Sequence, residues 1–134
     1  MKQAGALLLV LMLAGCAGLT RPACPAGQEK LRTAQLFFGR NVGDKPAVSE
    51  AEFRRFVDEE LTTRFPDGLT VLDGGGQWKG KENRLIRESA KVVLIVLPHG
   101  KEPEARLEAD KLAYKTRFNQ DAVMLVTQPA CVSF

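Results

Sequence analysis

Three cysteines are the residues of this chain with the most distinctive chemistry, and they lie far apart. Cys16 follows Leu13-Ala14-Gly15 at the end of an apolar run, while Cys24 and Cys131 lie toward the two ends of the remaining chain. A thiolate is a nucleophile and a ligand, and two thiols in an oxidising compartment pair. The surroundings of Cys16 favour acylation of its sulfur, and those of the other two favour a disulfide.

Residues 1–15 have the pattern of an export signal. One positive charge at Lys2 precedes the apolar residues 4–13, a run too short for a spanning helix, which needs roughly 20 residues. Leu13-Ala14-Gly15-Cys16 resembles the lipobox of bacterial lipoprotein precursors. This resemblance implies cleavage before Cys16 and acylation of its sulfur and new amino group. The alternative is an ordinary signal peptide with a cysteine there by chance.

The lipobox fixes an expected location and domain organisation. Two or more acyl chains on Cys16 anchor a protein stably, so the lipid bilayer is an expected partner. Ala17 stands where an aspartate tends to mark inner-membrane retention, which favours the outer membrane with the domain facing the periplasm. We expect a signal peptide over residues 1–15, a lipidated tether over 16–32, and a single domain over 33–134.

Acylation of Cys16 leaves Cys24 and Cys131 as an even pair. The exported compartment is oxidising, so the sequence predicts a Cys24–Cys131 disulfide, with two free thiols as the alternative. The bridge would close a loop of over 100 residues, for which chain entropy gives about 4 to 5 kcal/mol as an upper figure.

The overall charge and the remaining polar residues favour no particular chemistry. With 19 basic and 16 acidic side chains the formal net charge is +3, which implies no strong attraction to nucleic acid. His99 is the only histidine, which excludes a histidine-rich metal site and leaves a weak acid–base candidate. Ser49 and Ser89 have no neighbouring base. We therefore predict no catalytic residue, metal or cofactor.

One segment has the composition of a small-ligand pocket. Gly74-Gly75-Gly76 lacks the pattern of a phosphate-binding loop, and a bulge or bend in an edge strand explains it better. The polar and aromatic side chains near this run could line a pocket. The alternatives are that Trp78 packs at the sheet edge and that Arg64 complements a helix dipole. The candidate pocket residues are Arg64, Asp73, Gln77, Trp78 and Arg87.

The elements that must position these residues follow from periodicity and turn signals. Strands are expected over residues 33–40, 69–78, 85–97 and 122–127, the last with a continuation to 132 left open. Helices are expected over 49–65, which begins at the capping box Ser49-Glu50-Ala51-Glu52, and over 103–119. The order is that of the ferredoxin-like split βαβ fold, β-α-β-β-α-β, in the α+β class. It predicts an antiparallel sheet of strand order 4-1-3-2 with two helices on one face. In this order the last strand lies antiparallel beside the first, so Cys24, before the first strand, and Cys131, at the end of the last, are expected to lie close together.

The strand over residues 85–97 is apolar on both faces, although only one is expected to be covered by helices. An exposed apolar face implies a partner or a ligand. We expect a homodimer through sheet faces or edges, and the alternative is that residues 17–32 fold back over the face.

Several long motifs resemble one bacterial family. Leu36-Phe37-Phe38-Gly39-Arg40, the run over residues 64–73, and Gly75-Gly76-Gln77-Trp78 resemble the domain-of-unknown-function family 3574. Residues 91–96 and 114–118 extend the resemblance, which covers roughly residues 33–127. Many members look like exported proteins or lipoproteins, and the resemblance transfers no catalytic residue. The expected role is a membrane-anchored binding or interaction module, and the alternative is a small enzyme or ligand binder using the pocket near residues 74–78.

Overall fold

A computed structural model describes residues 23–134. Cys16, the lipobox and the first part of the expected tether lie outside the described residues. In chain order the elements are β1 (Glu29–Gly39), β2 (Asn41–Val42), β3 (Lys45–Pro46), α1 (Glu50–Phe56), η1 (Val57–Leu61), α2 (Thr62–Arg64), β4 (Thr70–Lys79), η2 (Lys81–Asn83), β5 (Leu85–Leu97), α3 (Glu102–Phe118) and β6 (Met124–Val132). Among residues 23–134 there is no helix long and apolar enough to cross a membrane.

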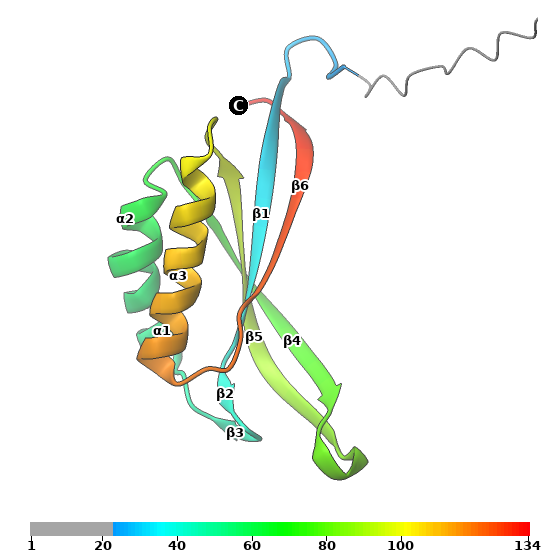
Figure 1. The fold of residues 1–134 in the computed structure, drawn as a ribbon, viewed down its shortest axis with the longest axis vertical. Coiled ribbons are helices and arrows are strands. Elements are labelled where there is room, and N and C mark those ends of the chain that lie inside the picture. The colour runs from blue at the N-terminus through cyan, green and yellow to red at the C-terminus, as the bar shows by residue number, and fades with distance from the viewer. Residues whose placement is uncertain (1–22) are drawn as a thin grey trace, which may run out of the picture.

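The main sheet has the strand order β4-β5-β1-β6, and each neighbouring pair is antiparallel. This is the predicted 4-1-3-2 order, in which β5 and β1 are central. The helices lie together on one side of the sheet (Figure 1). The predicted α+β ferredoxin-like fold is confirmed.

The first helical segment begins where the capping box predicted. The Glu52 backbone N–H donates to Ser49 Oγ at 3.2 Å, and the Ser49 backbone N–H donates to Glu52 Oε2 at 2.8 Å. Elements α1, η1 and α2 follow one another without a break, with a π-helical turn at η1, and the segment ends at Phe65 before Pro66. Reciprocal capping satisfies two backbone N–H groups that the helix leaves without partners.

Aromatic rings fill the layer between helices and sheet. Phe38 of β1 packs edge-on against Phe53, Phe56 and Tyr114, with ring centroids 4.7 to 5.8 Å apart. Phe38, Phe56 and Tyr114 are completely buried. The Tyr114 hydroxyl donates to the backbone carbonyl of Gly39 at 2.9 Å, so its polar atom is satisfied inside the core.

One expected strand boundary is wrong, and the end of the last strand, which the sequence left open, is now defined. β1 begins at Glu29 rather than residue 33, because Glu29–Arg32 pair with β6 over Pro129–Val132. Residues 29–32 therefore belong to the sheet and not to a tether, and they do not fold back over it. β6 does continue past Pro129 to Val132, which an edge strand permits because it needs no N–H donor on its free side.

The glycine run does not form a bulge. Gly74, Gly75 and Gly76 pair one to one with Ala90, Ser89 and Glu88 in an uninterrupted ladder between β4 and β5. They lie in an edge strand, as predicted, but in regular register. Residues 41–48, which separate the first expected strand from the first expected helix and were expected as a loop, contain the short β2–β3 hairpin, whose turn holds Gly43 at a φ of 63°.

β4 and β5 extend beyond the rest of the sheet. β5 pairs with β1 only from Ala90 to Leu97, and the Ser89 carbonyl accepts the Arg40 backbone N–H at 3.1 Å, so residues 85–88 of β5 pair with β4 alone. We call residues 75–89 the arm. It projects from the body as a two-stranded ribbon (Figure 1).

Candidate functional site

The predicted disulfide is present. Cys24 and Cys131 are bonded, with their Cα atoms 5.5 Å apart and a sequence separation of 107. Cys131 lies opposite Lys30 in the β1–β6 ladder, so the bridge closes the end of that ladder at which β1 begins. It ties the segment before β1 to the last strand.

Arg64, the first of the five predicted pocket residues, is held within the helical layer. Its Nη1 donates to Glu60 Oε2 and to Asp110 Oδ1, each at 2.7 Å. Asp110 on α3 is completely buried, and its Oδ2 has no hydrogen-bond partner among the described residues. Burial raises the pKa of Asp110 to about 6, and the neighbouring Arg64 opposes that rise. Arg64 thus joins α2 to α3.

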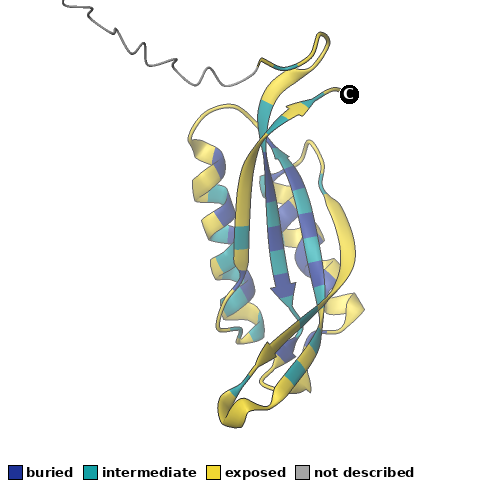
Figure 2. Cartoon of the chain, turned by 90° about the vertical axis from the view of Figure 1, so that its right-hand side faces the viewer, coloured by how far each residue is buried: buried dark blue, intermediate teal, exposed yellow. Residues whose placement is uncertain are grey.

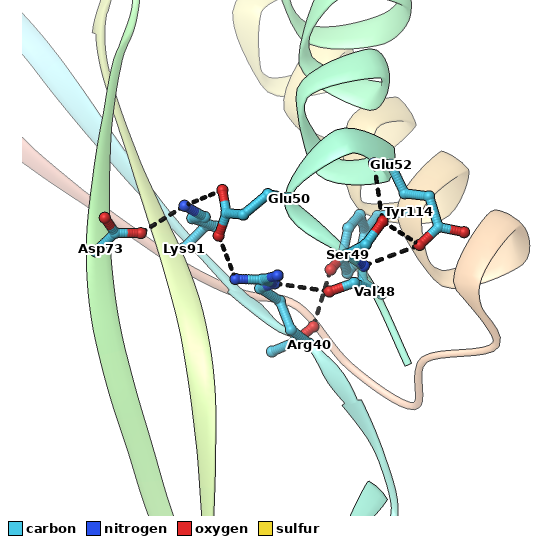
Figure 3. Close-up of polar contacts among 9 residues, drawn as sticks. Arg40, Val48, Ser49, Glu50, Glu52, Asp73, Lys91 and Tyr114 are labelled. Atoms are coloured by element: carbon cyan, nitrogen blue, oxygen red, sulfur yellow. Dashed lines mark hydrogen bonds and ion pairs between the residues drawn. The ribbon is translucent and has the colours of Figure 1, made fainter. Parts of the chain in front are cut away.

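Asp73 belongs to a polar cluster at the N-terminal end of α1 (Figure 3). Lys91 Nζ pairs with Asp73 and lies 2.8 Å from Glu50 Oε2, and Glu50 Oε1 pairs with Arg40 Nη1 at 2.5 Å. The hydrogen bond from Lys91 is the largest cause of the lowered pKa of both Asp73 and Glu50. The same contacts raise the pKa of Lys91. Two cations and two carboxylates satisfy one another here.

The remaining three predicted residues lie on the arm. Gln77 pairs with Arg87, and Trp78 pairs with Ile86. Neighbouring residues of a strand point to opposite faces, so Trp78 lies on the other face from Gln77. Asp73 and Gln77 share a face but are four residues apart, about 13 Å at the rise of a strand. The structure therefore distributes the five residues over three places and does not bring them together.

The face of the sheet away from the helices is apolar, as the sequence predicted. In β5, Val93, Ile95 and Leu97 are buried under the helices, whereas Val92, Leu94 and Val96 alternate with them and are half-buried. Figure 2 shows buried and half-buried residues alternating along the central strands β1 and β5, whereas the edge strands β4 and β6 are mostly exposed. Side chains of directly opposed residues on neighbouring strands lie on the same face, so the strand register identifies the residues of β1, β4 and β6 that share this face with Val92, Leu94 and Val96.

We call this surface the open face. It consists of Leu31, Thr33, Gln35 and Phe37 on β1, Thr70, Leu72 and Gly74 on β4, Ala90, Val92, Leu94 and Val96 on β5, and Met124, Val126, Gln128 and Ala130 on β6. None of these residues is charged. Large apolar side chains stay accessible at its two edges, with Leu72 51% and Met124 56% exposed.

A groove of about 570 Å³ lies at the end of the open face where β1 begins and β5 ends. Its floor includes Leu31, Leu94 and Val96. At its rim His99 Nε2 lies 2.6 Å from Glu29 Oε1. A smaller groove of about 270 Å³ adjoins it and shares Leu31 and His99. Neither contains any of the five predicted pocket residues.

Sequence reasoning missed this groove, although one signal for it was available. Residues 92–97 are apolar at every position, so one alternate set of these side chains had to lie on the face that the helices leave uncovered. Residues from β1, β5 and the loop at 67–69 meet there only through the strand order. Among the described residues no cluster of three or more histidine, cysteine, aspartate or glutamate side chains could hold a metal ion.

Two solved structures have a similar fold. A phage SAM lyase in complex with S-methyl-5'-thioadenosine has a TM-score of 0.61 and 17% identity, covering 85% of this chain and 95% of that one. A phage SAM lyase in the apo state has a TM-score of 0.59 and 19% identity, covering 78% and 90%. At these identities the likeness shows the fold alone.

A comparison with curated proteins found no match. The family resemblance in the sequence is confirmed, because residues 33–134 match the model of a family described as protein of unknown function (DUF3574). The match spans every strand and helix after the first residues of β1. The chain therefore belongs to the DUF3574 family.

Proposed function

We propose that this protein is a lipid-anchored binding module of the bacterial cell envelope, and that the open face is its binding surface. The observation that carries the proposal is the composition of that face. An antiparallel sheet with one covered face normally carries polar residues on the other. Here the other face holds no charged residue and leaves Leu72, Met124 and Val126 accessible. Apolar patches of this extent mark interaction sites.

The polar residues favour binding over catalysis. Arg64, Asp73 and Lys91 are engaged in ion pairs that join elements of the fold. Such pairs use these three charges to hold elements of the fold together. The open face, in contrast, has apolar surface with no partner among the described residues.

The disulfide supports the anchored part of the proposal. Structural disulfides form in exported proteins, and the Cys24–Cys131 bridge leaves Cys16 as the one cysteine outside it. Acylation at Cys16 would attach the domain to a membrane through residues 17–28. We place it in the outer membrane, with the domain in the periplasm.

Metabolic labelling tests the anchor. Cells expressing the full chain are grown with radiolabelled palmitate, and the protein is expected to carry label and to fractionate with membranes. Cys16→Ala should lose both properties. The matched control, Cys24→Ser with Cys131→Ser, should keep the label because it leaves Cys16 in place. Label that persists in Cys16→Ala would remove the anchor from the proposal.

Site-specific photo-crosslinking in intact cells tests the binding surface. A photoreactive residue at Leu72 or Met124 is expected to give adducts. The same residue at Leu112, which is 65% exposed on α3 on the other side of the molecule, should give none. Equal adduct formation at all three positions, or adducts at Leu112 alone, would contradict the proposal.

A second candidate function is small-ligand binding in the groove, with catalysis as its extension. The groove volume of about 570 Å³ lies in the usual range for ligand sites, about 300 to 1,000 Å³. One protein of similar fold was solved in complex with S-methyl-5'-thioadenosine, which is a fold-level analogy only. In this function the His99–Glu29 pair at the rim would supply the polar recognition group.

Thermal shift separates this candidate from the first. S-methyl-5'-thioadenosine at 100 times its Kd would stabilise the fold by about 2.7 kcal/mol. The shift should disappear in Val96→Trp, which fills the groove floor, and persist in Leu112→Ala. Absence of any shift up to millimolar concentration would exclude this ligand and leave the binding module unaffected.

A further inference from the structure

We propose that the occupant of the open face is a second copy of this chain, bound open face to open face about a two-fold axis. This inference rests on the proposed function, because it names the partner of the same surface. Its support comes from the size of the face, from its chemistry, and from the arm.

The size of the open face suits a dimer. Four strands spaced about 4.8 Å apart give a width of about 19 Å, and a nine-residue strand such as β6 is about 30 Å long. The flat area is therefore about 600 Å², and the relief of the side chains and the arm adds to it. A stable interface needs about 800 Å² from each partner. The open face is large enough to provide most of this area.

The chemistry of the face is self-complementary. Two identical surfaces repel when either carries net charge, and this one has none. The acidic groups at its two ends are already engaged, since Glu29 pairs with His99 and Glu88 Oε2 accepts the Asn41 backbone N–H at 3.2 Å. A charged partner would gain no ion pair here, whereas a second copy meets an apolar surface like its own.

A polar group on the central strand β1 also suits a second copy. Gln35 carries both a donor and an acceptor in its carboxamide, so it can pair with Gln35 of an identical chain.

The arm gives an independent reason. An isolated two-stranded ribbon is marginally stable in water, and among the described residues β5 has only β4 as a strand partner over residues 85–88. Glu88 and Arg84 add side-chain contacts to Asn41 and Asp44 of the β2–β3 hairpin. Trp78 is 41% exposed and lies, with Ile86, on the same face of these strands as the open face. A second copy seated on the open face would extend along the strands and cover this apolar surface.

Photo-crosslinking of two tagged copies tests the inference. Full-length chains with different epitope tags are expressed together, with the photoreactive residue at Met124. The expected result is an adduct of twice the monomer mass that carries both tags, with none from Leu112. An adduct with a different protein would overturn the dimer and keep the proposed function. No adduct at all would overturn both.

Sedimentation of the purified lipidated chain in detergent gives a second measurement. Leu94→Asp places an uncompensated charge at the centre of the face and is expected to weaken dimerisation by about 100-fold or more. Leu112→Asp should leave the dimer unchanged. A circular dichroism melt of each variant establishes that it is folded. A wild-type chain that is monomeric at 100 µM, or a folded Leu94→Asp variant with unaltered dimerisation, would refute the inference.

Discussion

The Cys24–Cys131 bridge provides the prediction with the clearest magnitude. Replacing both residues by serine releases a loop with a sequence separation of 107. In the chain-entropy model this constraint on the unfolded state is worth about 4.8 kcal/mol at 25 °C. A domain of this size has a free energy of unfolding of about 5 to 15 kcal/mol, so the bridge accounts for a large share of it.

The position of the bridge determines how much of this calculated stabilisation should be lost when the bridge is removed. It lies at the end of the β1–β6 ladder, beyond the Lys30 and Cys131 pair, while the buried residues of β1 begin at Thr33. Its removal allows the first residues of β1 to fray but leaves the aromatic core in place. The folded state is therefore little altered, and the loss comes mainly from the greater freedom of the unfolded chain. We expect a decrease of about 3 to 5 kcal/mol in the free energy of unfolding.

Urea unfolding followed by far-ultraviolet circular dichroism measures this loss. The double serine variant should unfold at lower urea concentration, with a melting temperature about 15 °C lower. Its m-value should rise, because the released chain exposes more surface on unfolding. A decrease in the free energy of unfolding below about 1 kcal/mol, with an unchanged m-value, would refute the reasoning. It would mean that the bridge does not appreciably restrict the unfolded chain.

Three further predictions concern the fold that carries the open face. The pKa of Asp110 is raised to about 6, above its ordinary value of 3.8, so the stability that Asp110 contributes is complete below about pH 4 and is lost as pH rises through 6. The variant Asp110→Asn should therefore reduce the decline in the free energy of unfolding between pH 4 and 7 by up to about 3 kcal/mol. Urea titrations that give the two proteins the same dependence on pH would contradict this. Tyr114→Phe removes the hydrogen bond to the Gly39 carbonyl and should cost about 1 to 2 kcal/mol in the same unfolding assay, a neutral effect being the contrary result. Ser49→Ala removes the helix cap and should cost about 1 kcal/mol, against which Ser89→Ala serves as a control with little expected effect.

Local signals accounted for most of the element order. The Ser49 capping box, Pro66 after the first helical segment and the apolar residues 92–97 each act over a few residues, so the sequence by itself was sufficient to locate them. The start of β1 was missed because Glu29–Arg32 have no apolar alternation. They are strand through backbone pairing with β6, which depends on a segment about 100 residues away.

The predicted pocket shows why proximity in sequence is a poor guide to a site on a strand. Gln77 and Trp78 are neighbours in the chain but point to opposite faces of the arm. Arg64 is close to them in sequence, yet its partner is Asp110, which comes to it by the packing of α3 against α2. Only the tertiary structure decides which side chains share a surface.

The sequence determined the family, the alternation of its strands and the cysteine pair, since all three are written in residue types and spacing. The open face and its groove were decided by the fold. Their residues come from β1, β4, β5 and β6, which are contiguous only because the strand order β4-β5-β1-β6 places them side by side. A strand that is apolar at every position, such as residues 92–97, has two apolar faces, and the helices, by packing on one of them, decide which face stays open.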